Sequence, residues 1–230
     1  MLKRLLLILL LTWPMLALAE LSPFKIGFEM LRDGKRLGRA ELSLVKQADG
    51  SWQFSSVNQG TEGLAGMAKV SIRELSMFDA DAAGMRTRSY TYQQDMLFKS
   101  RRRSVTVDGD RVRLDDGDDV HDLALPAGGV LDRNLILLAL MRDVSGTESE
   151  RTYAVADKRE IDTQRFRFGA VEQVTTPAGV FAARSVLRVR ENPGRTTTTW
   201  FAESLGWLPV RILQVEPDGE TLELRLERKP

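Results

Sequence analysis

A short, uniformly apolar run in mid-chain constrains the fold most. Residues 135–141 are apolar on every side, and they follow Asp132. Asp132 is a good N-cap, because its carboxylate can accept a hydrogen bond from a free N–H of the first helical turn. We therefore predict a helix over residues 132–142. A helix that is apolar all round is buried, and about 7 apolar residues fall far short of the roughly 20 that span a bilayer.

Almost all of the remaining chain has the pattern of β-strands. Phe24, Ile26 and Phe28 alternate with polar residues, which is typical of a half-buried strand. Turn signals such as Asp33-Gly34 recur about every ten residues, as in sandwiches and barrels. A single helix in mid-chain argues against a parallel sheet, in which each crossover needs its own helix. The sequence therefore predicts a mainly all-β fold: a curved antiparallel sheet, forming an open or half β-barrel around one buried central helix.

The N-terminus has the three parts of a secretory signal peptide. Lys3 and Arg4 precede an apolar run over residues 5–11, Pro14 interrupts that run, and Ala17-Leu-Ala19 is a small-residue cleavage signal. We expect cleavage after Ala19. An uncleaved anchor helix is the alternative, and the position of Pro14 disfavours it. The expected organisation is a signal peptide over residues 1–19 and a single antiparallel β domain over residues 20–230, located in the periplasm.

Composition excludes several classes of function. The chain has no cysteine, so neither disulfides nor thiolate chemistry nor a lipid anchor at the cleavage site is expected. The formal net charge is +1, and two basic residues belong to the signal peptide. Bulk charge therefore gives no argument for a nucleic-acid partner.

Local motifs give little support to catalysis or cofactor binding. His121 is the only histidine, in an acidic segment between Asp115 and Asp122. We interpret this segment as a solvated turn, with a weak cation site as the open alternative, because the spacing of a calcium loop is absent. The chain lacks the serine-hydrolase elbow as well. We expect a non-enzymatic protein with no cofactor and no metal site.

Two further segments allow a functional and a plain structural interpretation. Residues 60–66 contain three glycines, but neither the Lys-Ser/Thr tail of a phosphate loop nor a following helix pattern. They are interpreted as a mobile apolar loop at a cavity mouth, or as a simple surface loop. Arg101, Arg102 and Arg103 alternate in direction on a strand. They form either a solvated edge or a contact for anionic headgroups or a partner.

The candidate ligand-binding residues are large apolar side chains. Trp52, Trp200 and Trp207 either pack in the core or line an apolar cavity, since ligand cavities are mostly apolar. Leu64 and Met67 would gate the mouth of that cavity.

Three short segments resemble one bacterial envelope family. These are Asp33-Gly-Lys-Arg-Leu-Gly38, then Thr175-Thr-Pro-Ala-Gly179 before a strand with Arg184, and residues 196–211, which end in Leu-Pro-Val-Arg. The resemblance is to the domain of unknown function 3108 family and would cover about residues 24–227. It implies an exported, mostly antiparallel β protein, and it supplies no catalytic residues.

The expected architecture is also similar to that of periplasmic lipoprotein carriers, in which a helix fills an apolar concavity. Fold alone does not dictate function. We expect a periplasmic binding or carrier protein for an apolar envelope ligand, such as a lipid or acyl chain, with lipid, a lipoprotein or envelope proteins as partners. The alternative is an envelope-assembly scaffold without a ligand cavity. A small outer-membrane barrel is disfavoured, because several strands place Arg or Lys on both faces.

Overall fold

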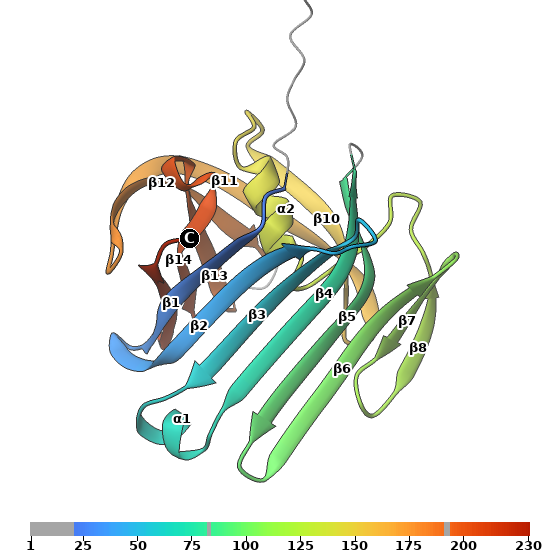
Figure 1. Ribbon diagram of the computed structural model, residues 1–230, viewed down its shortest axis with the longest axis horizontal. Coiled ribbons are helices and arrows are strands. Elements are labelled where there is room, and N and C mark those ends of the chain that lie inside the picture. The colour runs from blue at the N-terminus through green and yellow to red at the C-terminus, as the bar shows by residue number, and fades with distance from the viewer. Residues whose placement is uncertain (1–20, 82–83, 191–193) are drawn as a thin grey trace, which may run out of the picture.

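The computed structural model describes residues 21–81, 84–190 and 194–230 (Figure 1). The predicted signal peptide and its cleavage point therefore lie outside the described residues. The first eight strands are β1 (Phe24–Arg32), β2 (Lys35–Lys46), β3 (Trp52–Gly60), β4 (Ser71–Asp81), β5 (Gly84–Met96), β6 (Lys99–Asp108), β7 (Arg111–Asp115) and β8 (Val120–Ala124). The others are β9 (Leu131–Asp132), β10 (Glu150–Asp157), β11 (Glu160–Thr176), β12 (Gly179–Val189), β13 (Thr196–Ala202), β14 (Leu208–Val215) and β15 (Thr221–Arg228).

These strands form one open sheet in the order β8-β7-β6-β5-β4-β3-β2-β1-β15-β14-β13-β12-β11-β10-β9. The sheet has two arms, because β1 to β8 form one antiparallel meander and β10 to β15 form another, with β9 added beside β10. Antiparallel pairing of β1 with β15 joins the arms, and among the described strands only β9 and β10 pair in parallel. The predicted curved, mainly antiparallel sheet is confirmed.

Helix α2 (Ile136–Asp143) lies inside the curve of the sheet (Figure 1). Leu138 is fully buried, and the core around the helix draws residues from both arms. Phe28 and Phe54 come from the first arm, and Val210 and Leu226 from the second. The prediction of a buried helix wrapped by the sheet is therefore confirmed.

The predicted start of this helix at Asp132 is wrong by four residues. Asp132 lies in β9 and pairs with Ala156, so its backbone is extended. Its carboxylate does not cap the helix but the turn before it, since Oδ1 accepts hydrogen bonds from Asn134 N at 2.9 Å and Leu135 N at 3.0 Å. A turn that this carboxylate caps therefore separates β9 from α2.

The strand order leaves a gap between the two edge strands of the sheet, β8 and β9, and a few contacts between the arms narrow this gap. Thr87 N on β5 donates to Val130 O at 3.0 Å, so the segment around β9 lies between β5 and β10. Nearby, Arg159 of the β10–β11 turn binds Asp116 Oδ2 through Nε at 2.7 Å. These are isolated contacts rather than a ladder, and the sheet is not closed into a barrel.

Residues 60–66, predicted as a mobile loop at a cavity mouth or a simple surface loop, contain part of a short helix instead, α1 (Gly63–Met67). Gly66 N donates to Glu62 O at 3.0 Å, and a Cβ at Gly66 would lie 2.7 Å from the Thr61 carbonyl carbon. Glycine at this position thus permits a tight turn. A 3₁₀ helix, η1 (Glu203–Leu205), precedes β14. Within the described ranges, no helix has the length and apolarity to cross a membrane.

Candidate functional site: the open inner face

The inner face of the sheet changes from fully buried to half-buried along several strands. On β15, Leu226 is 0% exposed, whereas Leu224 and Leu222 on the same face are half-buried. Helix α2 covers one end of the concave side, and the hairpin tips with α1 lie at the other (Figure 1). We call the half-buried positions beyond the helix the open inner face. Its members include Asn58, Ile72, Arg188, Ile212, Leu222 and Leu224.

Three arginines mark the border between the core and the open inner face. The guanidinium carbons of Arg103 on β6 and Arg133 after β9 lie 5.4 Å and 5.6 Å from the ring centroid of Tyr92. Arg188 on β12 follows Val186, a core residue of the same face. We call Arg103, Arg133 and Arg188 the arginine row. These side chains come from both arms of the sheet.

The arginine row is incompletely neutralised by neighbouring acids. Arg133 Nε lies 3.2 Å from Glu74 Oε2, which also accepts a 2.6 Å hydrogen bond from Tyr90. Among the described residues, neither Arg103 nor Arg188 has a carboxylate within ion-pair distance. Arg103 Nε is buried and has no hydrogen-bond partner in that part of the chain. A buried donor without a partner is costly, so this atom can gain from an acceptor.

The electrostatic surroundings of Arg188 also favour the binding of an anion. Burial lowers the pKa of Arg188, and the positive charge of Arg133 lowers it further. Asp162 and Asp157 act in the opposite direction, but the net pKa stays below the usual value. An anion bound near Arg188 would relieve this loss of hydration and like-charge repulsion.

A buried polar network fixes the segment before α2. The Asp132 carboxylate is fully buried and accepts hydrogen bonds from Ser76 Oγ at 2.8 Å and Thr87 Oγ1 at 3.0 Å. Asn134 Nδ2 donates to Ser76 Oγ at 3.0 Å. Burial raises the pKa of Asp132 to about 6, although the hydrogen bonds favour its charged form. Through this network, Asp132, which precedes Arg133 of the arginine row, is hydrogen-bonded to β4 and β5.

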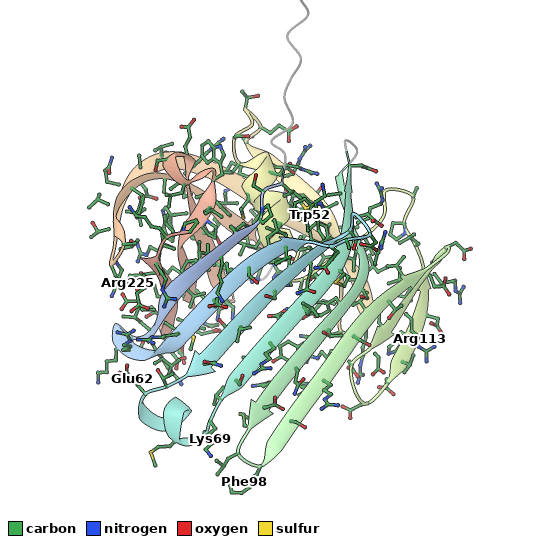
Figure 2. All side chains as sticks on the ribbon, in the orientation of Figure 1. Trp52, Glu62, Lys69, Phe98, Arg113 and Arg225 are labelled. Atoms are coloured by element: carbon green, nitrogen blue, oxygen red, sulfur yellow. The ribbon has the colours of Figure 1, made fainter. Side chains whose placement is uncertain are left out.

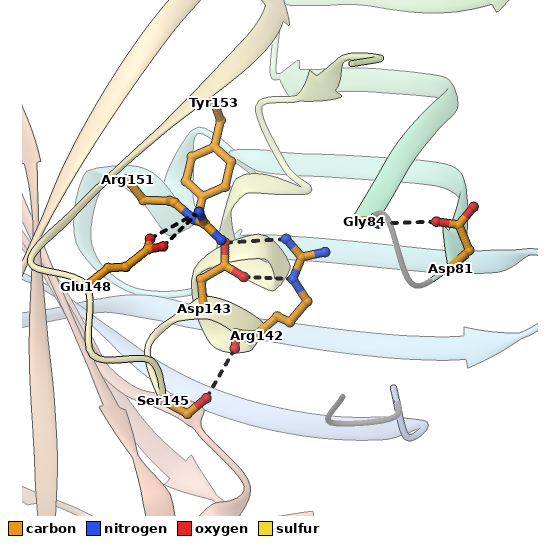
Figure 3. A network of polar contacts seen from close by, with 8 residues as sticks. All are labelled: Asp81, Gly84, Arg142, Asp143, Ser145, Glu148, Arg151 and Tyr153. Carbon is orange, nitrogen blue, oxygen red and sulfur yellow. Dashed lines mark hydrogen bonds and ion pairs between the residues drawn. The ribbon is translucent and has the colours of Figure 1, made fainter. Parts of the chain in front are cut away.

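A second network fixes the C-terminal end of α2 (Figure 3). Asp143 accepts hydrogen bonds from Arg142 Nε at 2.7 Å and Tyr153 Oη at 2.8 Å, and Arg151 Nε lies 3.3 Å from it. Burial alone would raise the pKa of Asp143, but these donors and the two arginine charges outweigh burial and lower it. Arg184 adds hydrogen bonds to backbone oxygens just beyond the helix.

The two predicted binding residues Trp52 and Trp200 belong to the packed core. Trp52 is 6% exposed, and Figure 2 places it at the α2 end of the sheet. Trp200 is 8% exposed, and its Nε1 donates to Glu172 at 2.5 Å. The guanidinium carbon of Arg211 lies 4.8 Å from the Trp200 ring centroid.

The other predicted binding residues lie at separate places. Trp207 lines an outer groove of about 310 Å³ together with Val171, Ala182 and Arg184. It adopts a left-handed backbone conformation with φ 64°, which is strained for a large side chain. Met67 is 76% exposed on α1, and the side chain of Leu64 lies outside the described residues. The groove at Trp207 includes none of the other four predicted residues.

The acidic segment before β8 is less solvated than predicted. Asp116 is 6% exposed, and hydrogen bonds from Arg159 and from the backbone of Asp119 and Asp118 lower its pKa to about 2. His121 is half-buried in β8, with Nε2 buried and without a partner among the described residues. In the ranges that the structure describes, no three His, Cys, Asp or Glu side chains gather as a metal site.

Comparison with known families identifies the chain. The family model described as "Protein of unknown function (DUF3108)" matches residues 24–227. The chain belongs to this family. The predicted resemblance is therefore confirmed, and the DUF3108 match spans all fifteen described strands apart from the last residue of β15.

A solved structure supports the fold of this DUF3108 protein. It is the β-barrel-like protein of the domain of unknown function DUF1849 from Brucella abortus, with a TM-score of 0.54 and 10% identity. The match covers 89% of the DUF3108 chain and 95% of the Brucella chain. At this identity the likeness concerns the fold alone. No curated protein matches the sequence.

Proposed function

We propose that this DUF3108 protein is a periplasmic, non-enzymatic binding or carrier protein for a lipid or acyl-chain ligand of the cell envelope. The observation that carries the proposal is the change along the strands from a packed core to the open inner face. Ile72, Ile212, Leu222 and Leu224 offer apolar surface there without being fully buried. Covering such surface contributes about 25 cal/mol per Å² removed from water.

The arginine row gives this ligand a polar end. A ligand with an alkyl chain and an anionic head would place the chain against the leucines and isoleucines and the head near Arg103 and Arg188. Guanidinium groups form strong, paired hydrogen bonds with carboxylates and phosphates. Burial of about five methylenes of the alkyl chain would contribute about 4 kcal/mol to the free energy of binding. The proposed ligand is therefore an anionic amphiphile.

Binding can be tested with ligands that share one alkyl chain. Titration calorimetry with dodecyl phosphate, dodecylphosphocholine and dodecanol separates the contribution of the chain from that of the head. Dodecyl phosphate is expected to bind most tightly, because only its head has a net negative charge. Absence of binding by all three, together with lipid-free protein in native mass spectrometry after periplasmic expression, would contradict the carrier function.

Matched variants locate the ligand. Leu222→Asn on the open inner face should weaken binding of all chain-bearing ligands, whereas Thr221→Asn, its half-buried neighbour on the opposite face, should not. Arg188→Gln should lower the preference for dodecyl phosphate about tenfold. This is the change expected from the loss of one charge-assisted interaction. Arg113→Gln, an exposed arginine of β7, is the charge control.

A scaffold role is the second candidate, and the groove at Trp207 favours it. Val171 beside Trp207 is 60% exposed, so this outer groove presents apolar surface to a protein partner. If the amphiphiles do not bind, crosslinking from Val171 in the periplasm becomes the informative experiment. Adducts with an envelope protein would favour the scaffold.

A further inference from the structure

The tip of the β5–β6 hairpin exposes an unusually large apolar side chain. Phe98 is 95% exposed, Leu97 beside it is 50% exposed, and both lie in the turn between β5 and β6. Figure 2 shows Phe98 at the end of the sheet opposite to Trp52. A phenyl ring in water is unfavourable, and exposed apolar groups that gather together mark interaction sites.

The hairpin tip is joined to a second exposed apolar side chain. Leu97 N donates to Ala68 O at 3.0 Å, so the segment after α1 lies beside the β5–β6 turn. Met67 on α1 is 76% exposed, and Met96 at the end of β5 is 37% exposed. We call Met67, Met96, Leu97 and Phe98 the apolar tip. Two segments separated in sequence thus present one patch.

Basic residues surround the apolar tip. Lys69 and Lys99 adjoin it in sequence, and Arg101 and Arg102 follow on β6. All four are exposed, and none has a carboxylate within ion-pair distance among the described residues. Of the acids nearby, Glu62 pairs with Arg36, whereas Asp95 accepts a hydrogen bond from the neutral amide of Gln93 and keeps its charge. Four exposed cations thus outnumber this carboxylate, and the charge beside the apolar tip is mainly positive.

We propose that the apolar tip and its basic ring dock the protein onto a bilayer surface that contains anionic lipids. Phe98, Leu97 and Met67 enter the interface between headgroups and acyl chains, and the lysines and arginines contact the lipid phosphates. Apolar insertion combined with basic residues is the combination that holds proteins on anionic membranes. A protein partner would be expected to leave fewer unpaired cations around so small an apolar patch.

Flotation of the full mature chain with vesicles tests this proposal. Phosphatidylcholine vesicles that contain phosphatidylglycerol should bind the protein, and pure phosphatidylcholine vesicles should bind it far less. Phe98→Ser should weaken vesicle binding about tenfold, which corresponds to removing one large side chain from the interface. Val180→Ser is the matched control, because Val180 is 63% exposed near the start of β12, in the other arm of the sheet.

The basic ring has its own control. Lys69→Gln combined with Lys99→Gln should weaken binding to the phosphatidylglycerol vesicles and reduce its dependence on salt. Arg111→Gln should leave binding unchanged, since Arg111 begins β7 beyond the opposite end of β6. Equal melting temperatures of the variants would show that the fold is intact.

Insertion can be read directly from a reporter at the tip. A Phe98→Trp variant should show a fluorescence blue shift on binding, and brominated acyl chains should quench it. Lack of vesicle binding by the unmodified protein, or a Phe98→Ser variant that binds as well as the unmodified protein, would overturn the proposal. This outcome is independent of the amphiphile titrations, because those ligands test the open inner face.

Discussion

Thr87 and Asp132 hold each other through two hydrogen bonds that run in opposite directions. Thr87 Oγ1 donates to Asp132 Oδ2 at 3.0 Å and accepts from Asp132 N at 2.8 Å. One residue lies on β5 in the first arm, and the other on β9 in the second. The pair therefore joins the arms at the point where the chain turns into α2.

Thr87→Val should test the contribution of this pair, because valine keeps the shape and removes the hydroxyl. It leaves the buried Asp132 N–H without its acceptor and removes one donor from the carboxylate. We expect a loss of about 2–3 kcal/mol in the free energy of unfolding, measured by urea denaturation. Thr91→Val, at an exposed position of the same strand, should change stability by less than about 0.5 kcal/mol. Equal effects of the two would contradict the role of the pair.

Asp132 should make stability fall as the pH rises from about 4 to 6. Its pKa in the folded protein is about 6, above the ordinary aspartate pKa of 3.8. In this window the unfolded chain releases the proton while the folded protein keeps it, so ionisation favours unfolding. Over the whole window, the free energy of unfolding should fall by about 3 kcal/mol. Asp132→Asn should remove this component from the stability profile, and an unchanged profile would show that another group is responsible.

Arg184 should be essential for the end of α2. Its Nη1 donates to Val144 O at 2.7 Å and Gly146 O at 2.6 Å, and its Nε donates to Gly169 O at 3.1 Å. Lysine cannot reproduce this planar fork. Both Arg184→Lys and Arg184→Met should therefore lower the free energy of unfolding by about 2 kcal/mol or more.

Exposed arginines offer a comparison for that measurement. Arg167→Met removes a surface ion pair with Glu150, which should cost at most about 1 kcal/mol. Thermal unfolding of the three variants gives the ranking, and rescue by Arg184→Lys would show that only the charge matters.

Asp116 should titrate well below an ordinary aspartate as long as Arg159 is present. Its pKa of about 2 lies below the unfolded value, so its contribution to stability exists above about pH 4 and is lost as the pH falls toward 2. Arg159→Gln should raise this pKa toward the usual range, and Lys158→Gln should not. The titration of the Asp116 carboxyl carbon by NMR measures both, and an unshifted Asp116 in the Arg159 variant would contradict the contact.

Local sequence patterns could predict most of the fold, because alternation and turn signals act within one strand. The alternation of Phe24, Ile26 and Phe28 predicts a half-buried strand, and these residues lie in β1 with Ile26 and Phe28 buried. The two-residue β9 had no such signal, since its pairing with Val155 and Ala156 depends on tertiary contacts. For the same reason the helix was predicted to begin too early.

The candidate site could be predicted only in part. Arg188 shares its face with Val186, so an arginine at an inward position was a readable signal. That it approaches Arg133 follows from the curvature of the sheet, which no local pattern encodes. The tryptophans were predicted from their size alone, and size does not distinguish a core position such as Trp52 from the groove at Trp207.

The pairing of β1 with β15 means that the two ends of the sheet-forming chain lie next to each other. Gly27 is opposite Arg228, so a short linker could join them. Opening the chain between β8 and β9 would then give a circular permutant in which the antiparallel strand neighbours are consecutive in sequence. Such a permutant has a lower contact order and should fold faster than the natural connectivity.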